Sequence, residues 1–276
     1  MKKNGNCDRP PVSAVVIAFN EEDRLSACLS SLDWVEEIVV VDSCSTDATC
    51  QVASRFTDRI LEHPFENFAA QKKWAVEQVS HNWVLNLDAD EALSPSLVEE
   101  LKVLPASVWE HCSGMEMPIS TNFFGRGLKF GGWYPNYHLR CFRKDSCRFN
   151  ELPVHESILV EGTVHRLRHP LLHRPYRNLA HYLEKVDRYS TLAAGEMFKN
   201  RKLKEVAAIN IALRPAACFL RRFILQLGFL DGFAGLVANG FHVMYVFLKY
   251  AKIWEMKQRD RGCSGTGMKA PGNEPG

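Results

Sequence analysis

Three continuous apolar runs of strand length constrain the fold of this chain more than any other feature of its sequence. The runs are "VSAVVIA" at 12–18, "EIVVVD" at 37–42 and "WVLNL" at 83–87. A run that does not alternate with polar residues is typical of a strand buried on both faces. Apolar residues at helical spacing lie between the runs, in 25–32 and 66–79. Strands that alternate with helices predict an α/β fold with a mainly parallel sheet and right-handed crossovers.

Each apolar run is followed by polar side chains. Asn20, Asp42, Asp88 and Asp90 all lie at predicted carboxyl ends of strands, where parallel sheets form their ligand crevice. Carboxylates this close in sequence repel one another, and removing them from water is costly unless a positive charge lies among them. They are therefore either solvated at a strand end or hold a cation. Mg²⁺ and Mn²⁺ bind one or two carboxylates together with phosphate oxygens and water, so a divalent ion with a nucleotide fits the pattern.

The charge of the chain is unevenly distributed, although the net charge is only +2. Residues 1–110 contain 9 Lys and Arg against 19 Asp and Glu, whereas residues 111–276 contain 25 against 13. A basic half indicates a polyanionic partner or a membrane surface. No nucleic-acid-reading motif is recognisable, so nucleic acid is not expected as the partner. The nine cysteines are odd in number and never spaced C-x-x-C, which suits a reducing cytosol, and Met1–Pro11 is too polar to predict a signal peptide.

The second half changes pattern and contains a spaced set of histidines. Short β-like pieces fill 115–173, and a polar amphipathic helix is predicted at 181–200. His165, His169 and His173 are four residues apart. On a helix they would form one metal-binding face, but Pro170 and the alternating pattern around it argue against a helix.

The apolar region 206–254 raises the question of a membrane. Its longest charge-free run, Gly232 to Leu248, has 17 residues, whereas a spanning helix needs roughly 20, so no spanning helix is predicted. Before this run, a predicted helix places Arg221 and Arg222 on the face opposite its apolar residues, which are Leu220, Phe223, Ile224 and Leu227. Two interpretations stay open: helices that lie in the interface of an anionic membrane, or a helical hairpin that packs on the catalytic domain or on a second subunit in a homodimer.

Four segments of the first hundred residues carry a resemblance to a known family. They are "VSAVVIAFNEE", "EIVVVDSCSTD", "NFAAQKKWAVE" and "WVLNLDADE". With these segments the chain resembles the family 2 inverting glycosyltransferases of GT-A fold, and "YHLRCFRK", "VHE" and "GFLDGFAGL" look like the lipopolysaccharide core glucosyltransferase branch. The family pattern after the second strand is commonly Asp-Asp-Gly-Ser-x-Asp. Here Ser43 and Cys44 replace the second Asp and the Gly.

The resemblance implies roles for individual residues in binding a nucleotide-diphosphate sugar. Asp42 would accept a hydrogen bond from the base, expected to be uracil, and Lys72 would approach the nucleotide or its diphosphate. Either could instead have a plain structural role, Asp42 at a strand end and Lys72 on a solvated helix face. Residues Ala18, Asn20 and Glu21 would line the same pocket.

A divalent metal, Mg²⁺ or Mn²⁺, follows from the same resemblance. Asp90 would be the principal ligand, Asp88 would bind the metal or the ribose, and His173 is a candidate further ligand. Because Arg presents a fork of donors, Arg140 is a candidate for binding the phosphates.

An inverting transfer also needs a base that takes the proton of the acceptor hydroxyl. The transition state is oxocarbenium-like, so a nearby carboxylate also stabilises the developing positive charge. "NELPVHESI" offers Glu151 and Glu156. We predict Glu156 as the base because His155 could orient it, and a place in a surface turn is the alternative.

The sequence therefore predicts an enzyme that moves a hexose from a UDP-sugar, such as UDP-glucose, to a hydroxyl of a membrane glycolipid, the lipopolysaccharide core. It would work in the cytoplasm, peripherally bound to the inner membrane. Transfer to a prenyl-phosphate carrier, or a non-catalytic sugar-nucleotide-binding partner protein, are the alternatives. The expected division is an N-terminal tail (1–11), a nucleotide-sugar-binding half (12–110) and an acceptor-binding half (111–200) of one GT-A domain, an amphipathic helical extension (201–258) and a disordered tail (259–276).

Overall fold

The computed structural model describes residues 9–149, 158–199 and 209–265, and it divides into two compact units. Met1–Pro175 form unit 1 and Tyr176–Gly276 form unit 2. The predicted helix at 181–200 belongs to unit 2, because it packs on the last helix of the chain.

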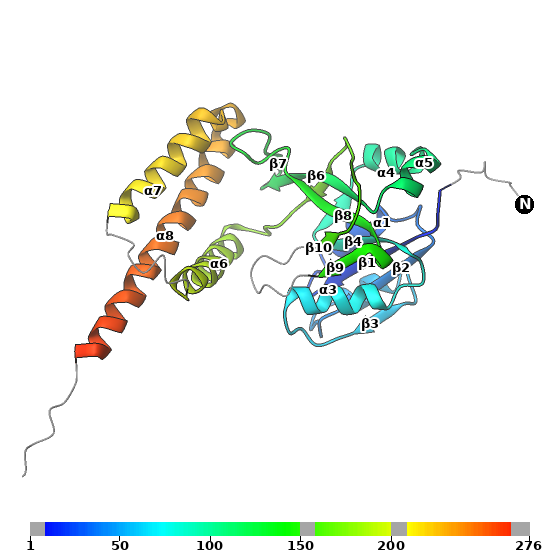
Figure 1. Ribbon diagram of the computed structural model, residues 1–276, viewed down its shortest axis with the longest axis horizontal. Coiled ribbons are helices and arrows are strands. Elements are labelled where there is room, and N and C mark those ends of the chain that lie inside the picture. Colours follow the sequence, from blue (N-terminus) through cyan, green and yellow to red (C-terminus); the bar gives the residue numbers. More distant parts are fainter. Residues whose placement is uncertain (1–8, 150–157, 200–208, 266–276) are drawn as a thin grey trace, which may run out of the picture. The chain divides into compact units, whose positions relative to one another are not determined.

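Unit 1 is a mixed α/β unit around a ten-stranded sheet (Figure 1). The strand order is β3-β2-β1-β4-β8-β6-β12-β5, and β7 and β11 also pair with β6. Strands β1 to β4 are mutually parallel where they pair, β8 runs antiparallel between β4 and β6, and β12 is parallel to β6. The mainly parallel sheet predicted from the sequence is confirmed. The strands are β1 (Val12–Ala18), β2 (Glu37–Asp42), β3 (Ile60–Glu62), β4 (Trp83–Asp88), β5 (Glu91–Leu93), β6 (Gly114–Phe123), β7 (Arg126–Gly127), β8 (Tyr137–Arg143), β9 (Cys147–Phe149), β10 (Ile158–Val160), β11 (Val164–Arg166) and β12 (Leu171–His173), of which β9 and β10 form a separate pair.

Helices cover both faces of the sheet, which is why its central strands are mainly apolar. On β1, the side chains of Val12, Ala14 and Val16 belong to one buried cluster, whereas Val15 belongs to another. The first cluster contains residues of α1, α4 and α5, and the second contains residues of α3. Because successive side chains of a strand point to opposite faces, a strand between two helical layers is apolar at most positions on both faces; the buried Ser13 of β1 and Asn86 of β4 are exceptions. The helices of unit 1 are α1 (Leu25–Ser30), α2 (Thr49–Ala53), α3 (Phe68–Glu77), α4 (Pro95–Lys102), α5 (Ala106–His111) and the short η1 (Lys144–Ser146).

Side-chain caps fix where two of these helices begin. Asn67 accepts a hydrogen bond from the backbone N–H of Ala70 at the start of α3. Ser94 does the same with the N–H of Leu97 at the start of α4, where Pro95 is the first helical residue. Each cap satisfies a backbone donor that has no partner within the helix, and proline at this position loses no intrahelical hydrogen bond.

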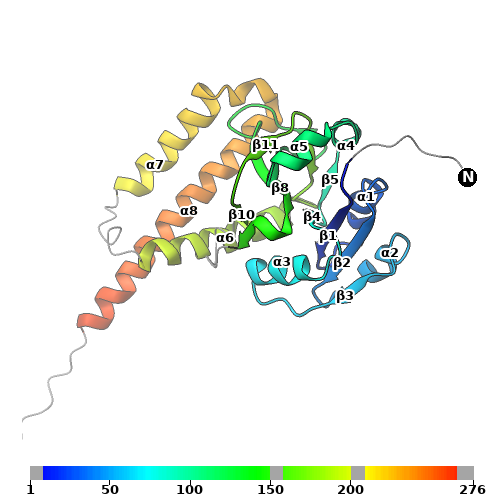
Figure 2. The same cartoon turned by 45° about the vertical axis from the view of Figure 1, so that its right-hand side comes forward.

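The described elements of unit 2 are helices. They are α6 (Leu179–Lys199), α7 (Ile209–Phe219), η3 (Leu220–Leu225), η4 (Gly228–Asp231) and α8 (Gly232–Gly265). The long helix α8 lies beside α6 and α7 (Figure 2), with Ala194, Tyr250 and Ile253 buried between α6 and α8. Among the described residues, no single helix is long and apolar enough to cross a membrane. The segments Ile209–Leu225 and Gly228–Asp260 pass that test only as a pair, with a bend of 72° between them.

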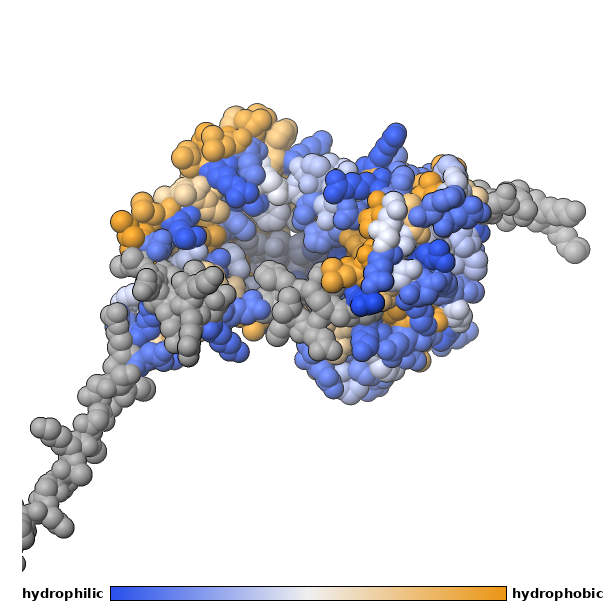
Figure 3. Space-filling view, viewed as in Figure 1, coloured by the Kyte–Doolittle hydropathy of each residue, from blue (hydrophilic) through white to orange (hydrophobic). Residues whose placement is uncertain are grey.

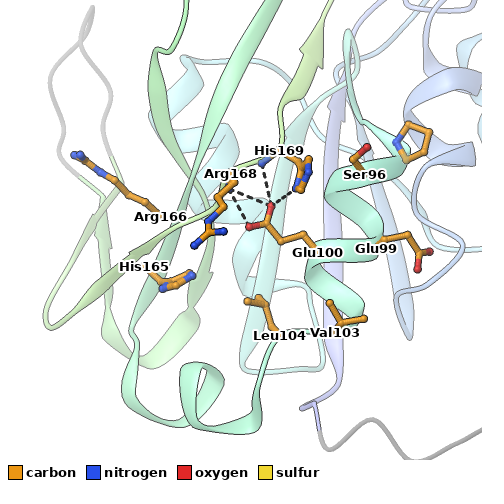
Figure 4. A pocket seen from close by; sticks show the side chains of 10 residues that line it. Ser96, Glu99, Glu100, Val103, Leu104, His165, Arg166, Arg168 and His169 are labelled. Atoms are coloured by element: carbon orange, nitrogen blue, oxygen red, sulfur yellow. Dashed lines mark hydrogen bonds and ion pairs between the residues drawn. The ribbon is translucent and has the colours of Figure 1, made fainter.

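Glu100 fastens α4 to the segment between β11 and β12 (Figure 4). Its carboxylate accepts hydrogen bonds from the backbone N–H groups of Arg168 and His169 and pairs with Nδ1 of His169 at 2.9 Å. Burial alone would raise the pKa of Glu100, but the hydrogen bonds from these two N–H groups and the His169 side chain hold it below its usual value. The carboxylate form is therefore favoured in the folded protein.

We expect Glu100→Gln to lower the free energy of unfolding by about 1 to 3 kcal/mol, because backbone donors lose a charged acceptor. A carboxyl group with a lowered pKa contributes stability that is complete above its unfolded pKa of about 4.3 and is lost as the pH falls through its folded pKa. The melting temperature of Glu100→Gln should therefore fall less than that of the wild type between about pH 6 and pH 3. The neighbouring Glu99→Gln, at an exposed position, is the control, and an equal pH dependence in both variants would contradict the assignment.

Candidate functional site

The register of the parallel strands brings three polar strand ends to one edge of the sheet. Ala18 of β1 lies opposite Asp42 of β2, and Ile17 of β1 lies opposite Asp88 of β4. The backbone N–H of Ala89 donates to the carbonyl of Ile17 at 3.2 Å. Neighbouring strands are separated by about 4.8 Å, so the segments that follow β1, β2 and β4 form one continuous rim.

Asp42 and Asn20 organise the loop that follows β2. The buried carboxylate of Asp42 accepts hydrogen bonds from the backbone N–H and the hydroxyl of Ser45, at 2.7 and 2.6 Å. Asn20 accepts from the N–H of Thr46, and its own N–H donates to Ser45. Cys44, in place of the glycine of the family pattern, has a φ of 62°, a left-handed conformation that glycine adopts without strain. Both strand-end residues therefore have structural contacts, although each carboxylate oxygen of Asp42 can accept a further hydrogen bond.

Asp88 lies between two cations from different elements. Lys72 of α3 is 3.2 Å from one carboxylate oxygen, and Arg140 of β8 is 3.5 Å from the other. Burial alone would raise the pKa of Asp88, but the charges of Lys72 and Arg140 outweigh it and hold the pKa well below its usual range. Lys72 is buried rather than on a solvated helix face. Asp88 is therefore ionised at neutral pH.

Glu91 is the most deeply buried carboxylate of this group, at 1% exposure. Arg140 donates to both of its oxygens, at 2.9 and 2.7 Å, and the backbone N–H of Asp88 donates to Glu91 as well. Because a two-pronged arginine contact fixes both distance and plane, Glu91 sets the position of Arg140 and also holds the turn that contains Asp88.

Asp90 lies between a histidine and a second arginine. Nε2 of His173 is 3.5 Å from one carboxylate oxygen, and the Arg24 guanidinium is 3.8 Å from the other. Arg24 also donates to both oxygens of Glu21 at 2.6 Å and to the carbonyl of Arg174 at 2.7 Å. Burial lowers the pKa of His173, but the hydrogen bond and the charge of Asp90 raise it by more, so the net shift is upward.

These contacts form two sets at neighbouring strand ends: Lys72, Asp88, Arg140 and Glu91 in one, and Glu21, Arg24, Asp90 and His173 in the other. Burial and the charge of Arg140 lower the pKa of His138, also on β8, to about 4, so that it is neutral at pH 7. The carboxylates of the two sets, with the exposed Asp23 3.8 Å from Arg24 in addition, outnumber their three cations, and His173 or a bound cation can neutralise part of this surplus. We call the two sets together the charged cluster; its members are Glu21, Arg24, Lys72, Asp88, Asp90, Glu91, Arg140 and His173.

The structure brings together most of the residues predicted from the sequence. Lys72, Asp88 and Arg140 are in one of the two sets, and Asp90 and His173 are in the other, which includes Glu21 through Arg24. Ala18, Asn20 and Asp42 lie on the adjoining strand ends. The predicted base Glu156 lies outside the described residues.

The other two spaced histidines lie away from this cluster. His165 and His169 line a hollow beside α4 that contains no member of the charged cluster (Figure 4). His165 is on β11, which pairs with the first residues of β6, near the amino end of the neighbouring parallel strands.

Sequence reasoning missed Glu91 and Arg24 as parts of the site. Glu91 belongs to the acidic motif itself, and Arg140 is a single charge among the apolar residues of "HLRCF". An isolated arginine on a buried strand requires a buried acid, and that signal points to a partner such as Glu91. Arg24 has no comparable signal, because its partner Asp90 is 66 positions away in the sequence.

The residues present fit a divalent cation that also binds a diphosphate. Oδ1 of Asp90 and Nε2 of His173 are 3.5 Å apart, close enough to bind one ion between them. Within the described ranges, no group of three or more His, Cys, Asp or Glu side chains is arranged to hold a metal. The chain thus offers a small donor set, as Mg²⁺ and Mn²⁺ sites do when phosphate oxygens and water complete the shell.

Comparison with known proteins gives three findings. The profile of Glycosyl transferase family 2 matches residues 13–103. The lipopolysaccharide core biosynthesis glycosyltransferase LpsC of Rhizobium meliloti is 32% identical over 252 residues, which cover 89% of this chain and 92% of LpsC. An uncharacterized glycosyltransferase of Rickettsia typhi is 26% identical over 262 residues, or 91% of this chain and 89% of that protein. The crystal structure of S. aureus TarS 1-349 in complex with UDP-GlcNAc gives a TM-score of 0.44 at 16% identity, with 88% of this chain and 92% of that chain covered; this likeness is too low to assign a ligand.

We expect Glu91→Gln to lower the free energy of unfolding by roughly 3 to 5 kcal/mol, because it leaves the buried Arg140 without its charged partner. Urea denaturation measures the change. The matched control is Asp145→Asn, which removes the carboxylate from an exposed pair with Arg143 and should cost less than about 1 kcal/mol. Similar losses in the two variants would show that the Glu91–Arg140 pair does not have the assigned role.

Proposed function

This chain is a glycosyltransferase of family 2, and from that premise we propose that it moves one hexose from a nucleotide-diphosphate sugar to a hydroxyl of a membrane glycolipid. We propose a UDP-sugar, such as UDP-glucose, as the donor. The observation that supports this most is the charged cluster at the joined ends of β1, β2 and β4. It combines phosphate-binding cations with carboxylates in the crevice where open α/β sheets bind nucleotides.

The charged cluster and the adjoining loop suggest how the donor binds. The free lone pairs of Asp42 would accept from the base, in a pocket lined by Ala18, Asn20 and Glu21. Asp88, whose charge Lys72 and Arg140 already compensate, would face the ribose or the metal. The same two cations, Lys72 and Arg140, would also bind the oxygens of the diphosphate.

Asp90 and His173 would hold a divalent cation, Mg²⁺ or Mn²⁺. Bound there, the ion would draw electron density from the diphosphate and make it a better leaving group. The carboxylates of the charged cluster outnumber its lysine and arginines, so a cation and an anionic donor would bind together more tightly than either alone.

The transfer is a single displacement that inverts the anomeric carbon. The acceptor oxygen forms a bond to that carbon on the face opposite the diphosphate, and the bond from the carbon to the diphosphate oxygen breaks. The acceptor proton passes to a carboxylate, for which Glu156 stays our proposal. Carboxylates near the sugar would also stabilise the positive charge that develops on the ring.

The acceptor is proposed from LpsC, which has the highest sequence identity among the proteins described above. LpsC is named for lipopolysaccharide core biosynthesis and aligns with nearly the whole chain. A growing lipopolysaccharide core is anchored in a membrane, so the enzyme would work in the cytoplasm at the inner membrane, with peripheral contact to anionic lipid. The basic half of the sequence supports that contact.

We expect Asp90→Asn to lower transfer from UDP-glucose to a truncated lipopolysaccharide acceptor by about a hundredfold or more, because the principal metal ligand is lost. Release of UDP measures the rate. Calorimetric titration of UDP with Mn²⁺ should show weaker binding in this variant. Glu156→Gln should lose transfer by about a hundredfold or more but keep UDP binding, because a base acts only in the chemical step.

Asp33→Asn, at an exposed position in the same unit, is the control and should leave both rate and binding unchanged. Full activity in EDTA, or wild-type UDP binding by Asp90→Asn, would refute the metal site. Tight UDP binding without transfer to any glycolipid or prenyl-phosphate acceptor would leave a binding protein instead of an enzyme.

A further inference from the structure

The turn between α7 and α8 presents an unusually apolar surface. Within 220–236, eight large apolar side chains are at least 44% exposed. Figure 3 shows the hydrophobic colouring gathered at this end of the helical unit. Soluble monomers rarely expose a contiguous apolar patch of this kind unless it contacts a partner. We call these residues the apolar tip: Leu220, Ile224, Leu225, Leu227, Phe229, Leu230, Phe233 and Leu236.

The backbone of the turn is held from the inside by small and polar residues. Gly228 is buried, and a Cβ atom there would lie 2.7 Å from the carbonyl oxygen of Arg222. A Cβ atom on Gly235 would overlap the carbonyl oxygen of Gly228. The fully buried Asn239 donates to the carbonyl of Gly235 at 2.7 Å and accepts from Nε of Arg222 at 3.2 Å.

This arrangement decides which way the large side chains point. Only glycine fits at positions 228 and 235, where backbones approach closely. The buried Asn239 of α8 links that helix to Arg222 of η3. The inside of the turn is thereby filled, so its large apolar residues have no place except the outside. The apolar tip is a preformed surface and not a frayed end.

The charges around the tip favour an anionic surface. Within 220–236 the sequence has two arginines, Arg221 and Arg222, and one acidic residue, Asp231. Arg221 is exposed, and its guanidinium has no hydrogen-bond or ion-pair partner in the part of the chain that the structure describes. A second copy of this chain would be a poor match, because a twofold interface places the same patch against itself and brings like charges together.

We propose that the apolar tip inserts into one leaflet of an anionic membrane, with Arg221 at the phosphate groups of the lipids. Apolar residues at the boundary between headgroups and acyl chains, flanked by cations, are the chemistry of monotopic insertion. The bend of 72° suits an element that enters and leaves the same face. The inference rests on the proposed function in one respect: a glycolipid acceptor would lie in the membrane that the tip binds.

Flotation with vesicles tests the proposal on the full-length protein. One set of vesicles is pure phosphatidylcholine, and the other contains phosphatidylglycerol as the anionic lipid. Leu225→Ser and Phe233→Ser change the two most exposed tip side chains, at 72% and 79%. We expect each to lower the ratio of bound to free protein by roughly tenfold, whereas Arg221→Gln should remove most of the preference for anionic vesicles.

Phe247→Ser is the matched control, because Phe247 is an exposed phenylalanine on α8 outside the tip. It should bind like the wild type, and all variants should keep the wild-type melting temperature and UDP binding. Equal loss of binding in Phe247→Ser and Phe233→Ser would overturn the assignment of the tip. So would a wild-type dimer in solution that Phe233→Ser converts to a monomer.

Failure of this proposal and failure of the proposed function give different results. If Phe233→Ser still binds vesicles while transfer to lipopolysaccharide persists, the tip is wrong and the enzyme assignment stands. If the wild type binds vesicles through the tip but no UDP-sugar reacts, the membrane surface stands without the activity.

Discussion

Arg140 reaches from β8 to the acidic turn after β4 and covers both oxygens of Glu91, a carboxylate that is almost fully buried. Without this contact a buried charge would have no compensation, a condition that proteins tolerate poorly. With it, the remaining donors of the guanidinium lie beside Asp88, and the backbone of Asp88 is tied to Glu91. The acidic rim can therefore persist in the folded protein before any ligand neutralises it.

The charged cluster and the apolar tip both place side chains against their solvent preference, in opposite ways. At the strand ends, charges are removed from water and are matched by partners from several distant segments. At the apolar tip, apolar side chains stay in water because Gly228 and, on α8, Gly235 and Asn239 bring the backbones of η3, η4 and α8 into close contact on the inside. In both places a well-ordered backbone determines which side chains are exposed and which are buried. An uncompensated feature that a rigid backbone maintains is the usual mark of a binding surface.

Much of unit 1 follows from local patterns. The apolar runs at 12–18 and 83–87 correspond to β1 and β4, and the caps at Asn67 and Ser94 begin α3 and α4. The three-residue strands β5 and β12 were missed, because runs this short have no periodicity of their own. β5 forms by pairing with β12, and β12 forms by pairing with both β5 and β6. Register between such strands places His173 opposite Glu91, which no spacing in the sequence indicates.

The sequence by itself determined the parallel sheet, the polar residues at its strand ends and the uneven charge, because these depend on side chains that are close along the chain. The tertiary structure alone decided which charges pair. Arg140 with Glu91, and Arg24 with Asp90, join residues that are 49 and 66 positions apart. It also decided that both carboxylate oxygens of Asp42 accept hydrogen bonds from Ser45, and that the side chains of the apolar tip face outward. The physical reason is that electrostatic and packing energies depend on distance in space, which spacing along the sequence does not record.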